Sequence, residues 1–235
     1  MILIVKMDIN NYDLATLMRL LPLLEQETQL QVSRFQMPED KKRTLLGNYV
    51  AKCLIARYTQ QNIEHVHFTT NAYGKKTVQK SPISFNLSHA GKWVVIALST
   101  NESIGVDVEK MEPIDIWEVA TFFSIAEQRY LKGLVGEEAE HAFYRIWTAK
   151  ESFLKCIGRG LSQPLDTFIV PLHSSAQPQS IESATVYSNT IQVYSFQIDS
   201  EHWCSISTND FKFPVDIMTL SKDFSVLTSE QMKMK

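Results

Sequence analysis

Hydrophobic and polar residues alternate along several short stretches of this chain. A period of two is typical of a strand with one buried face, because successive side chains point to opposite sides. In the segment IGVDVE at 104–109, three β-branched residues alternate with Gly, Asp and Glu. The pattern predicts strands at 2–8, 66–69, 85–88, 94–98, 104–109, 166–172 and within 184–208.

Apolar residues that recur three and four positions apart mark the helical stretches. The predicted helices cover 13–35 with a break at Pro22, 38–58, 115–131 and 139–157. Ser124, with Glu127 three residues later, fits a capping box, and Gly158 stands where the last helix should end. Since strands and helices mix without a strict βαβ order, we expect an α+β fold.

Composition narrows the class of protein. The 235 residues suffice for one large domain or two packed halves, and the net charge of −3 gives no electrostatic footprint for nucleic acid. No apolar run approaches the roughly 20 residues of a membrane helix, and the apolar start is too short for a secretory signal. Cys53, Cys156 and Cys204 are widely spaced without a CxxC, which favours a reduced, cytoplasmic setting over a zinc site.

Two carboxylates lie on one face of the strand predicted at 104–109. Asp107 and Glu109 are two residues apart, so both can reach one ion while the β-branched residues face the core. Oxygen ligands of this kind suit Mg²⁺, which completes its shell with water and phosphate. The simpler alternative, and the commoner one for such a pattern alone, is the solvated face of a strand.

The helix predicted at 139–157 carries a second group of charges. Glu151 and Lys155 are one turn apart and share a face, which is compatible with an ordinary surface ion pair or with a phosphate site. Lys150 falls within the apolar stripe, so its ammonium must extend to solvent or meet an anion, which includes the alternative of a structural carboxylate.

Other polar clusters are weaker signals. The turn SHAGKW at 88–93 brings Ser88 and His89 to a glycine turn that could donate to phosphate, although a histidine there is more often an ordinary turn residue. The basic clusters KKRT at 41–44 and GKK at 74–76 are more often solvated surface. The chain has no Walker loop, GxGxxG, GxSxG or HExxH motif.

Five motifs in order form a specific set. They are RTLLG (43–47), YGK (73–75), FNLSHAGKW (85–93), GVDVEK (105–110) and WTAKESFLKCIGRGLS (147–162). Over roughly 34–172 the chain closely resembles the 4′-phosphopantetheinyl transferases of the surfactin-synthetase-activating (Sfp) type. The resemblance implies a monomer with two similar α/β halves, 1–104 and 105–235, related by a pseudo-two-fold, each with a small antiparallel sheet packed on helices.

The resemblance also implies a reaction and its residues. The enzyme would move the phosphopantetheine arm of coenzyme A to a serine of a peptidyl or acyl carrier domain of peptide, polyketide or fatty acid synthases, releasing 3′,5′-ADP. It would activate non-ribosomal peptide synthetases, as in antibiotic biosynthesis, with no nucleic acid or membrane partner. The implied metal ligands for Mg²⁺, or Mn²⁺ in its place, are Asp107, Glu109 and Glu151. The implied catalytic residues are Glu151, also the candidate general base, Lys155 and Asp107. The implied coenzyme A contacts are Arg43, Thr44, Lys75, Ser88, His89 and Lys155.

In one stretch the chain departs from the family pattern. Family members carry lysines just before the RF pair that help to bind the 3′-phosphate of coenzyme A, whereas this chain has Thr28 and Gln31 there. We therefore expect a higher KM for coenzyme A than in a lysine-bearing relative.

The carrier-binding surface is the least defined part of the expectation. By resemblance, it lies near 158–189 and on the helices at 115–131, where Trp117, Phe122 and Phe123 could be exposed for docking. Aromatic residues at helical spacing are more often core, and we favour the core for these three. Two other functions remain open, namely a non-catalytic protein that binds coenzyme A or a carrier, and an Mg²⁺-dependent nucleotide pyrophosphatase.

Overall fold

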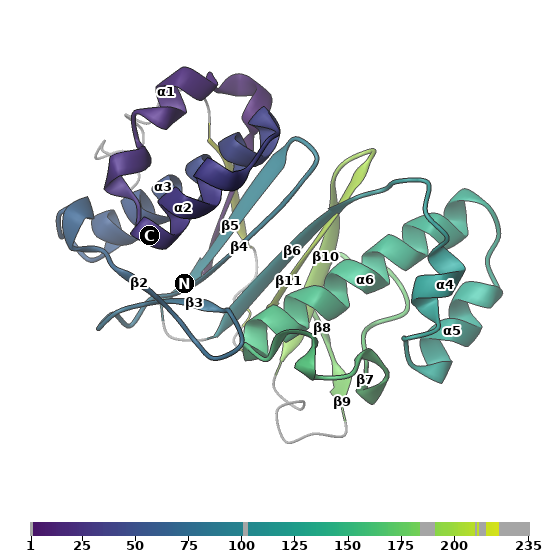
Figure 1. The fold of residues 1–235 in the computed structure, drawn as a ribbon. Coiled ribbons are helices and arrows are strands. Elements are labelled where there is room, and N and C mark those ends of the chain that lie inside the picture. The colour runs from purple at the N-terminus through teal and green to yellow at the C-terminus, as the bar shows by residue number, and fades with distance from the viewer. Residues whose placement is uncertain (1, 101–102, 184–190, 210, 212–214, 221–235) are drawn as a thin grey trace.

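Two four-stranded sheets, each covered by helices, make up the fold (Figure 1). The computed structural model describes residues 2–100, 103–183, 191–209, 211 and 215–220. The first sheet has the order β12-β1-β5-β4 and the second the order β6-β11-β10-β8. The mixed α+β class predicted from the sequence is confirmed.

The strands follow the alternating segments closely. The first sheet consists of β1 (Ile2–Asp8), β4 (Ser84–Ala90), β5 (Trp93–Ser99) and β12 (Asp216–Thr219). The second consists of β6 (Ile104–Lys110), β8 (Gln179–Ser180), β10 (Gln192–Asp199) and β11 (His202–Thr208). Two short ribbons pair β2 (Phe68–Thr70) with β3 (Lys76–Val78), and β7 (Phe168–Ile169) with β9 (Glu182–Ser183).

The helices also lie where the apolar spacing predicts them. They are α1 (Leu14–Met18), α2 (Gln26–Arg34), α3 (Pro38–Tyr58), α4 (Ile116–Ala120), α5 (Ile125–Lys132) and α6 (Glu137–Ile157). Short 3-10 helices cover Ile9–Asn11, Leu21–Leu23, Ile63–His65, Gly160–Ser162 and Leu165–Thr167. The predicted break at Pro22 falls in one of these, and the capping box of Ser124 and Glu127 is formed. Helix α6 ends at Gly158, whose φ of 69° suits glycine.

The first sheet is mixed, so the prediction of two purely antiparallel sheets is wrong at one strand. Strand β12 runs parallel to β1, with Leu3 opposite Asp216 and Lys6 opposite Thr219. It covers the edge of β1 whose backbone groups would otherwise lack a partner strand. Because β12 lies beyond residue 105, one strand of the proposed half 105–235 belongs to the sheet of the half 1–104. The strands expected within 184–190 and the tail after 220 lie outside the described residues.

The two sheets meet along β4 and β6 (Figure 1). Side chains of β4 bridge to the backbone of β6, since the Val106 amide donates to Asn86 Oδ1 at 2.9 Å and the Val108 amide to Ser88 Oγ at 3.3 Å. Behind this junction, apolar residues of both sheets form one buried cluster that includes Ile4, Val95 and Val106. Helix α3 packs on the first sheet and α6 on the second, and each covers a cluster of its own.

We call each four-stranded sheet with its covering helices a lobe, the first built on β1 and the second on β6. Lys150 belongs to the core of the second lobe. Its ammonium is fully buried, lies 2.8 Å from Glu127 Oε2 and donates to the carbonyls of Leu165 at 2.7 Å and Phe168 at 2.8 Å. Burial lowers the pKa of Lys150, while the Glu127 carboxylate raises it. Of the alternatives for this lysine, the structural carboxylate partner is confirmed. In the described part of the chain, no helix has the length and apolarity needed to cross a membrane.

Candidate functional site

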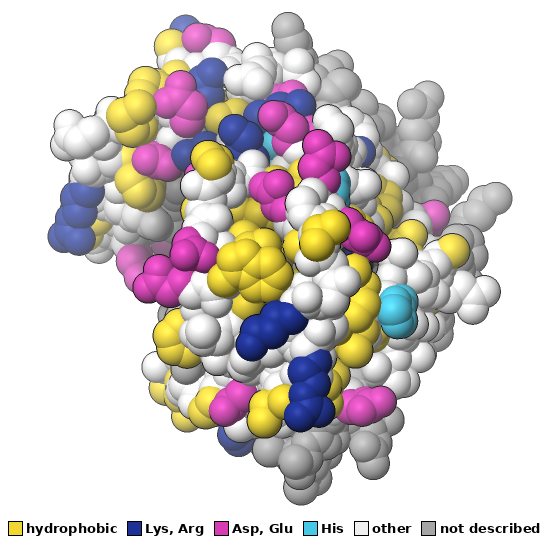
Figure 2. Space-filling view, turned by 90° about the vertical axis from the view of Figure 1, so that its right-hand side faces the viewer, with side chains coloured by type: hydrophobic (Ala, Val, Ile, Leu, Met, Phe, Trp, Pro, Cys, Tyr) yellow, Lys and Arg dark blue, Asp and Glu magenta, His cyan; other side chains and the backbone are white. Residues whose placement is uncertain are grey.

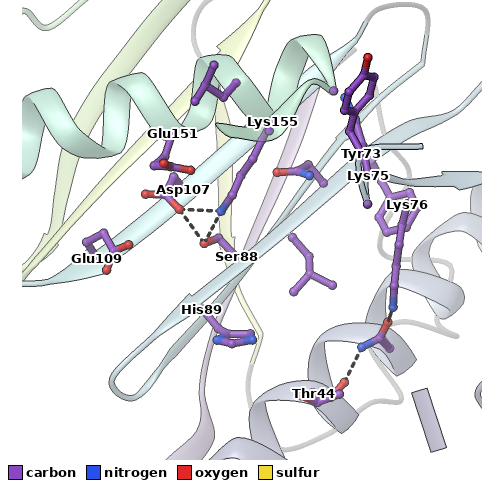
Figure 3. Close-up of a pocket in the computed structure, with 18 of the residues that line it drawn as sticks. Thr44, Tyr73, Lys75, Lys76, Ser88, His89, Asp107, Glu109, Glu151 and Lys155 are labelled. Atoms are coloured by element: carbon purple, nitrogen blue, oxygen red, sulfur yellow. Dashed lines mark hydrogen bonds and ion pairs between the residues drawn. The ribbon is translucent and has the colours of Figure 1, made fainter. Parts of the chain in front are cut away.

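A cavity of about 510 Å³ opens beside the β4–β6 junction (Figure 3). Its walls come from both lobes, because α2, α3 and the loop before β3 lie on one side and β6 and α6 on the other. The lining residues expected from the sequence are Thr44, Lys75, Ser88, His89, Asp107, Glu109, Glu151 and Lys155. Seven of the eight coenzyme A and catalytic positions that the motifs suggest, together with Glu109, therefore share one cavity, and Arg43 lies outside it.

The alternation of β6 explains where its carboxylates point. Asp107 and Glu109 face the cavity, while Ile104, Val106 and Val108 are buried on the opposite face. Gly105 allows α6 to approach this strand closely, because a Cβ there would lie 2.0 Å from the carbonyl oxygen of Ser152. The same-face prediction for Asp107 and Glu109 is confirmed, and both residues are at least partly shielded from water.

Lys155 is anchored at one end of the cavity by a triangle of contacts (Figure 3). Its Nζ lies 2.6 Å from Asp107 Oδ1 and 3.0 Å from Ser88 Oγ, and Ser88 Oγ in turn donates to Asp107 Oδ1 at 3.0 Å. Burial disfavours the ammonium, but the carboxylates of Asp107, Glu151 and Glu109 outweigh it and raise the pKa of Lys155. The lysine therefore stays charged and holds its place between β4, β6 and α6.

Three carboxylates, of Asp107, Glu109 and Glu151, lie at the same end of the cavity as this lysine (Figure 3). Burial and the negative charge of Asp107 raise the pKa of Glu109 to about 7, against the opposing effects of Trp147 and Lys155. Burial and Asp107 also raise the pKa of Glu151, which Lys155 partly offsets. Carboxylates close together in a site shielded from water repel one another when ionised. A cation bound at this end of the cavity would offset that repulsion and favour their ionised forms.

The chemistry of these residues fits a divalent cation. Asp107 Oδ2 is buried and has no hydrogen-bond partner among the described residues, and Glu109 and Glu151 add further hard oxygen donors. Over the described residues, however, no group of three or more His, Cys, Asp or Glu side chains is already drawn together as a metal cluster. The ammonium of Lys155 takes up one oxygen of Asp107, so the second oxygen remains as the donor for an ion.

Lys75 joins the loop before β3 to the end of α6. Its Nζ donates to the carbonyl of Cys156 at 2.8 Å and to that of Ile104 at 3.1 Å, and burial lowers its pKa. Asn71 supports the loop, since its Nδ2 donates to the carbonyl of Gly158 at 3.0 Å. Lys75 therefore lines the cavity, and its ammonium uses two of its N–H groups in hydrogen bonds to the backbone carbonyls of Ile104 and Cys156.

Arg43 and His89 lie at the rim. Arg43 donates from Nη1 to the carbonyl of Gly91 at 2.6 Å and pairs through Nη2 with Asp40 at 2.5 Å. It lines a neighbouring hollow of about 480 Å³, which also contains His89 and Glu109. The His89 side chain is partly open to solvent. Desolvation of its ring by the surrounding protein and the positive charge of Arg43 both lower its pKa.

The opposite end of the cavity contains two residues that sequence reasoning missed (Figure 3). Lys76 donates to Asn48 Oδ1 at 2.6 Å, and Asn48 Nδ2 donates to the carbonyl of Thr44 at 2.7 Å. Gln31 also lines this end, and Thr28 Oγ1 lies 3.5 Å from the Lys76 ammonium. The only signals in the sequence were the GKK cluster, which is more often surface, and the helical spacing of Thr44 and Asn48.

A hydrophobic face lies on the outside of the second lobe. Trp117 is 45% exposed and Phe122 65%, whereas Phe123 is 1% exposed and stacks on Phe143. Figure 2 shows hydrophobic side chains among lysines and arginines on the side of the molecule that α4 and α5 form. The preference for the core is confirmed for Phe123 and is wrong for the other two. Trp117 lies on the short helix α4 and Phe122 in the turn that follows it, and this segment buries only one of its sides.

Comparison with known proteins agrees with the motifs. The family model described as "4′-phosphopantetheinyl transferase superfamily" matches residues 103–207, and that described as "4′-phosphopantetheinyl transferase, N-terminal" matches residues 12–101. The chain is 35% identical over 204 residues to 4′-phosphopantetheinyl transferase Sfp of Bacillus subtilis (strain 168), an overlap of 86% of this chain and 90% of that protein.

Two further relatives extend the comparison. The chain is 29% identical over 182 residues to 4′-phosphopantetheinyl transferase gsp of Aneurinibacillus migulanus, covering 77% of this chain and 75% of the relative. It is 28% identical over 187 residues to 4′-phosphopantetheinyl transferase HetI of a Nostoc strain, covering 72% and 78%. This chain is therefore an enzyme of the 4′-phosphopantetheinyl transferase family, of the Sfp type that its five ordered motifs resemble.

Proposed function

We propose that this enzyme transfers the 4′-phosphopantetheine arm of coenzyme A to a serine of an apo carrier domain. The serine oxygen attacks the phosphorus next to the pantetheine, the bond from that phosphorus to the bridging oxygen breaks, and 3′,5′-ADP leaves. The serine proton passes to a base. The observation that carries the proposal is the cavity in which Lys155, Asp107 and Ser88 form a closed triangle beside Glu109 and Glu151.

Charge neutralisation is the main requirement of this reaction, because the pyrophosphate is an anion that a nucleophile must approach. We assign Mg²⁺, or Mn²⁺ in its place, to Asp107, Glu109 and Glu151, where the bound ion would neutralise pyrophosphate oxygens. Lys155 binds the same phosphates and stays protonated to do so. Ser88 holds Lys155 in position through its hydroxyl.

Glu151 is the proposed general base, acting directly or through a water. Burial and Asp107 raise its pKa, which brings the carboxylate nearer to the pH at which a base works best. Its place on α6, one turn before Lys155, puts it beside the phosphate-binding lysine. Asp107 contributes through its contact with Lys155 and through its second oxygen.

Four other residues are proposed to seat the nucleotide. Thr44 and His89 line the cavity, and the lowered pKa of His89 favours a neutral ring that can donate one hydrogen bond. Lys75 has an ammonium with three N–H groups, two of which meet backbone carbonyls, so one can address a phosphate. Arg43 acts from the rim, next to His89.

The carrier is proposed to dock on the face formed by α4 and α5. The hollow of about 480 Å³ shares His89 and Glu109 with the main cavity. Its lining mixes charged residues with an apolar part made by Val119, Phe143 and Trp147, and that apolar part suits the uncharged pantetheine chain. Arg129 and Lys132 end α5 and would meet the acidic surface expected of a carrier. Segment 158–189 remains a second candidate surface.

Several further properties belong to the proposal. Peptidyl and acyl carrier domains are the proposed partners, and activation of non-ribosomal peptide synthetases is the proposed role. We propose a monomer that works in the cytoplasm and is composed of halves 1–104 and 105–235 with a pseudo-two-fold relation.

Release of 3′,5′-ADP tests the proposed function. The purified chain is incubated with coenzyme A and Mg²⁺, with and without an apo peptidyl carrier domain, and the nucleotides are separated by chromatography. We expect 3′,5′-ADP in amounts that match the carrier, and a loss of turnover by about 10³-fold in Asp107→Asn. Breakdown of coenzyme A without a carrier would instead identify a pyrophosphatase, and binding of coenzyme A without turnover would identify a binding protein.

A further inference from the structure

Lys76 has a half-buried side chain, and the contacts of its ammonium are electrically neutral. It donates to Asn48 Oδ1 at 2.6 Å, lies 3.5 Å from Thr28 Oγ1 and stands 6.0 Å from the centre of the Phe68 ring. In the described part of the chain, no carboxylate oxygen comes within 4.0 Å of it. Glu25, the carboxylate with the largest favourable effect on the pKa of Lys76, is already paired with Lys52 at 2.9 Å.

Partial burial of a charge without a counter-ion already disfavours the charged form, so such groups tend to pair with an anion. Burial does lower the pKa of Lys76, and the more distant Glu25 and Glu27 raise it in part. Since Lys76 lines the cavity wall, the anion that would neutralise it can come from the ligand.

The position of Lys76 narrows the identity of that anion. It lies at the end of the cavity formed by Thr44, Asn48 and Gln31, away from the carboxylates around Lys155 (Figure 3). On the proposed function, the pyrophosphate of coenzyme A occupies the carboxylate end. Coenzyme A carries one other phosphate, on the 3′ oxygen of its ribose.

We infer that Lys76 binds the 3′-phosphate of coenzyme A in this chain, and so supplies from β3 the cation that Thr28 and Gln31 do not provide from α2. This inference rests on the proposed function. Asn48 acts as the positioning residue, because its amide is fixed by the carbonyl of Thr44 and directs the ammonium into the cavity. Lys76 thereby makes the enzyme selective for coenzyme A over the same molecule without the 3′-phosphate.

The test compares coenzyme A with 3′-dephospho-coenzyme A in the wild type and in Lys76→Met. A charge-assisted contact corresponds to about 10- to 100-fold in affinity. We expect Lys76→Met to raise the KM for coenzyme A by about that factor, to leave the KM for dephospho-coenzyme A unchanged and to keep kcat within about threefold. Lys41→Met, in the first turn of α3 and outside the cavity lining, is the matched control and should change neither KM.

Two further variants separate charge from packing. Lys76→Gln keeps a donor for Asn48 without the charge and should lose selectivity as Lys76→Met does, and Lys76→Met combined with Gln31→Lys should regain it. Equal losses for both substrates, or no loss for coenzyme A, would overturn the inference. If the wild type transfers no arm to any carrier, the proposed function fails separately. Calorimetric titration then measures the affinity of the wild type and of Lys76→Met for coenzyme A and for 3′-dephospho-coenzyme A. A loss of affinity in Lys76→Met for coenzyme A alone supports the inference, and equal losses for both ligands, or no loss for coenzyme A, overturn it.

Discussion

Two lysines on α6, five residues apart, illustrate how position decides the role of one residue type. Lys150 is fully buried against Glu127, whereas Lys155 lies at the cavity and pairs with Asp107. Both are charged groups held by a carboxylate, but only the second has a ligand-sized space beside it. The first contributes to stability and the second is proposed to bind phosphate.

Replacement of Lys150 by methionine should therefore cost stability. The Glu127 carboxylate would remain buried without its cation, although it still accepts hydrogen bonds from the amides of Ser124 and Val170. Removal of one partner of a buried pair typically costs about 3–5 kcal/mol in the free energy of unfolding. Urea denaturation at pH 7 measures it, and the exposed Lys132→Met should stay within about 0.5 kcal/mol. A loss below about 1 kcal/mol in Lys150→Met would contradict the assignment.

The raised pKa of Glu109 gives the metal requirement a pH dependence. Burial and Asp107 raise the pKa of this carboxyl to about 7, so below pH 7 a proton competes with the proposed cation. As pH falls from 8 to 6, the Mg²⁺ concentration for half-maximal activity should rise, by up to about tenfold per unit below the pKa. Glu109→Gln should need more Mg²⁺ at every pH and lack this rise. Equal requirements at pH 6 and pH 8 in the wild type would contradict the role.

Individual residues were predictable where a local pattern determines their direction. The strand period placed Asp107 and Glu109 on one face, and the helical stripe predicted that Lys150 needs a partner. Lys76 could not be found in this way, because its burial depends on α2 and α3 packing over a ribbon far away in the sequence. Propensity and periodicity carry no information on such long-range contacts.

At the scale of elements, the contact between β6 and α6 brings the site together. Gly105 has no side chain to separate them, so Glu151 and Lys155 come within reach of the strand's carboxylates. The sequence showed both elements but gave no sign of how closely they approach.

Gly105→Ala should destabilise the protein and impair the site together. The added Cβ would lie 2.0 Å from the Ser152 carbonyl oxygen and 2.4 Å from the Cys156 amide, and backbone atoms cannot move aside easily. We expect about 3 kcal/mol or more in the free energy of unfolding, measured by urea denaturation. Gly133→Ala is the control, since its φ of −81° suits alanine and it should change stability by less than about 1 kcal/mol. A fully stable Gly105→Ala would show that α6 can shift freely.

The aromatic pair before α5 offers a test of carrier docking. Phe122 is 65% exposed and Phe123 is 1% exposed, so their replacement by alanine should act on different quantities. Phe122→Ala should raise the KM for a carrier domain about tenfold or more and leave the stability and the KM for coenzyme A unchanged. Phe123→Ala should cost about 3–5 kcal/mol in unfolding free energy. An unchanged carrier KM in Phe122→Ala would remove α4 and α5 from the docking surface.

The same face shows why elements were easier to predict than surfaces. The helical spacing at 115–131 was right, yet it could not tell which aromatic residues the neighbouring helix covers. Exposure depends on how α4 and α5 pack against α6, which is a tertiary property. The short strand β3 was also missed, because three residues are too few to establish a period.

At the scale of the whole molecule, the site lies where two sheets meet without a continuous backbone ladder. Asn86 and Ser88 of β4 bridge to β6, and the helices on both sides leave the cavity beside this junction (Figures 1 and 3). The α+β class and the ordered motifs were predictable from the sequence. The parallel pairing of β12 with β1 was not, because it joins segments more than 200 residues apart.

The most direct test of the central claim is the intact mass of an apo peptidyl carrier domain after incubation with this protein, coenzyme A and Mg²⁺. Our account predicts a gain equal to one phosphopantetheine arm, which EDTA prevents and which is lost when the carrier serine is replaced by alanine. Glu151→Ala should reduce the rate of the gain by orders of magnitude. No mass gain on several peptidyl and acyl carriers, under conditions in which coenzyme A binds, would contradict the account.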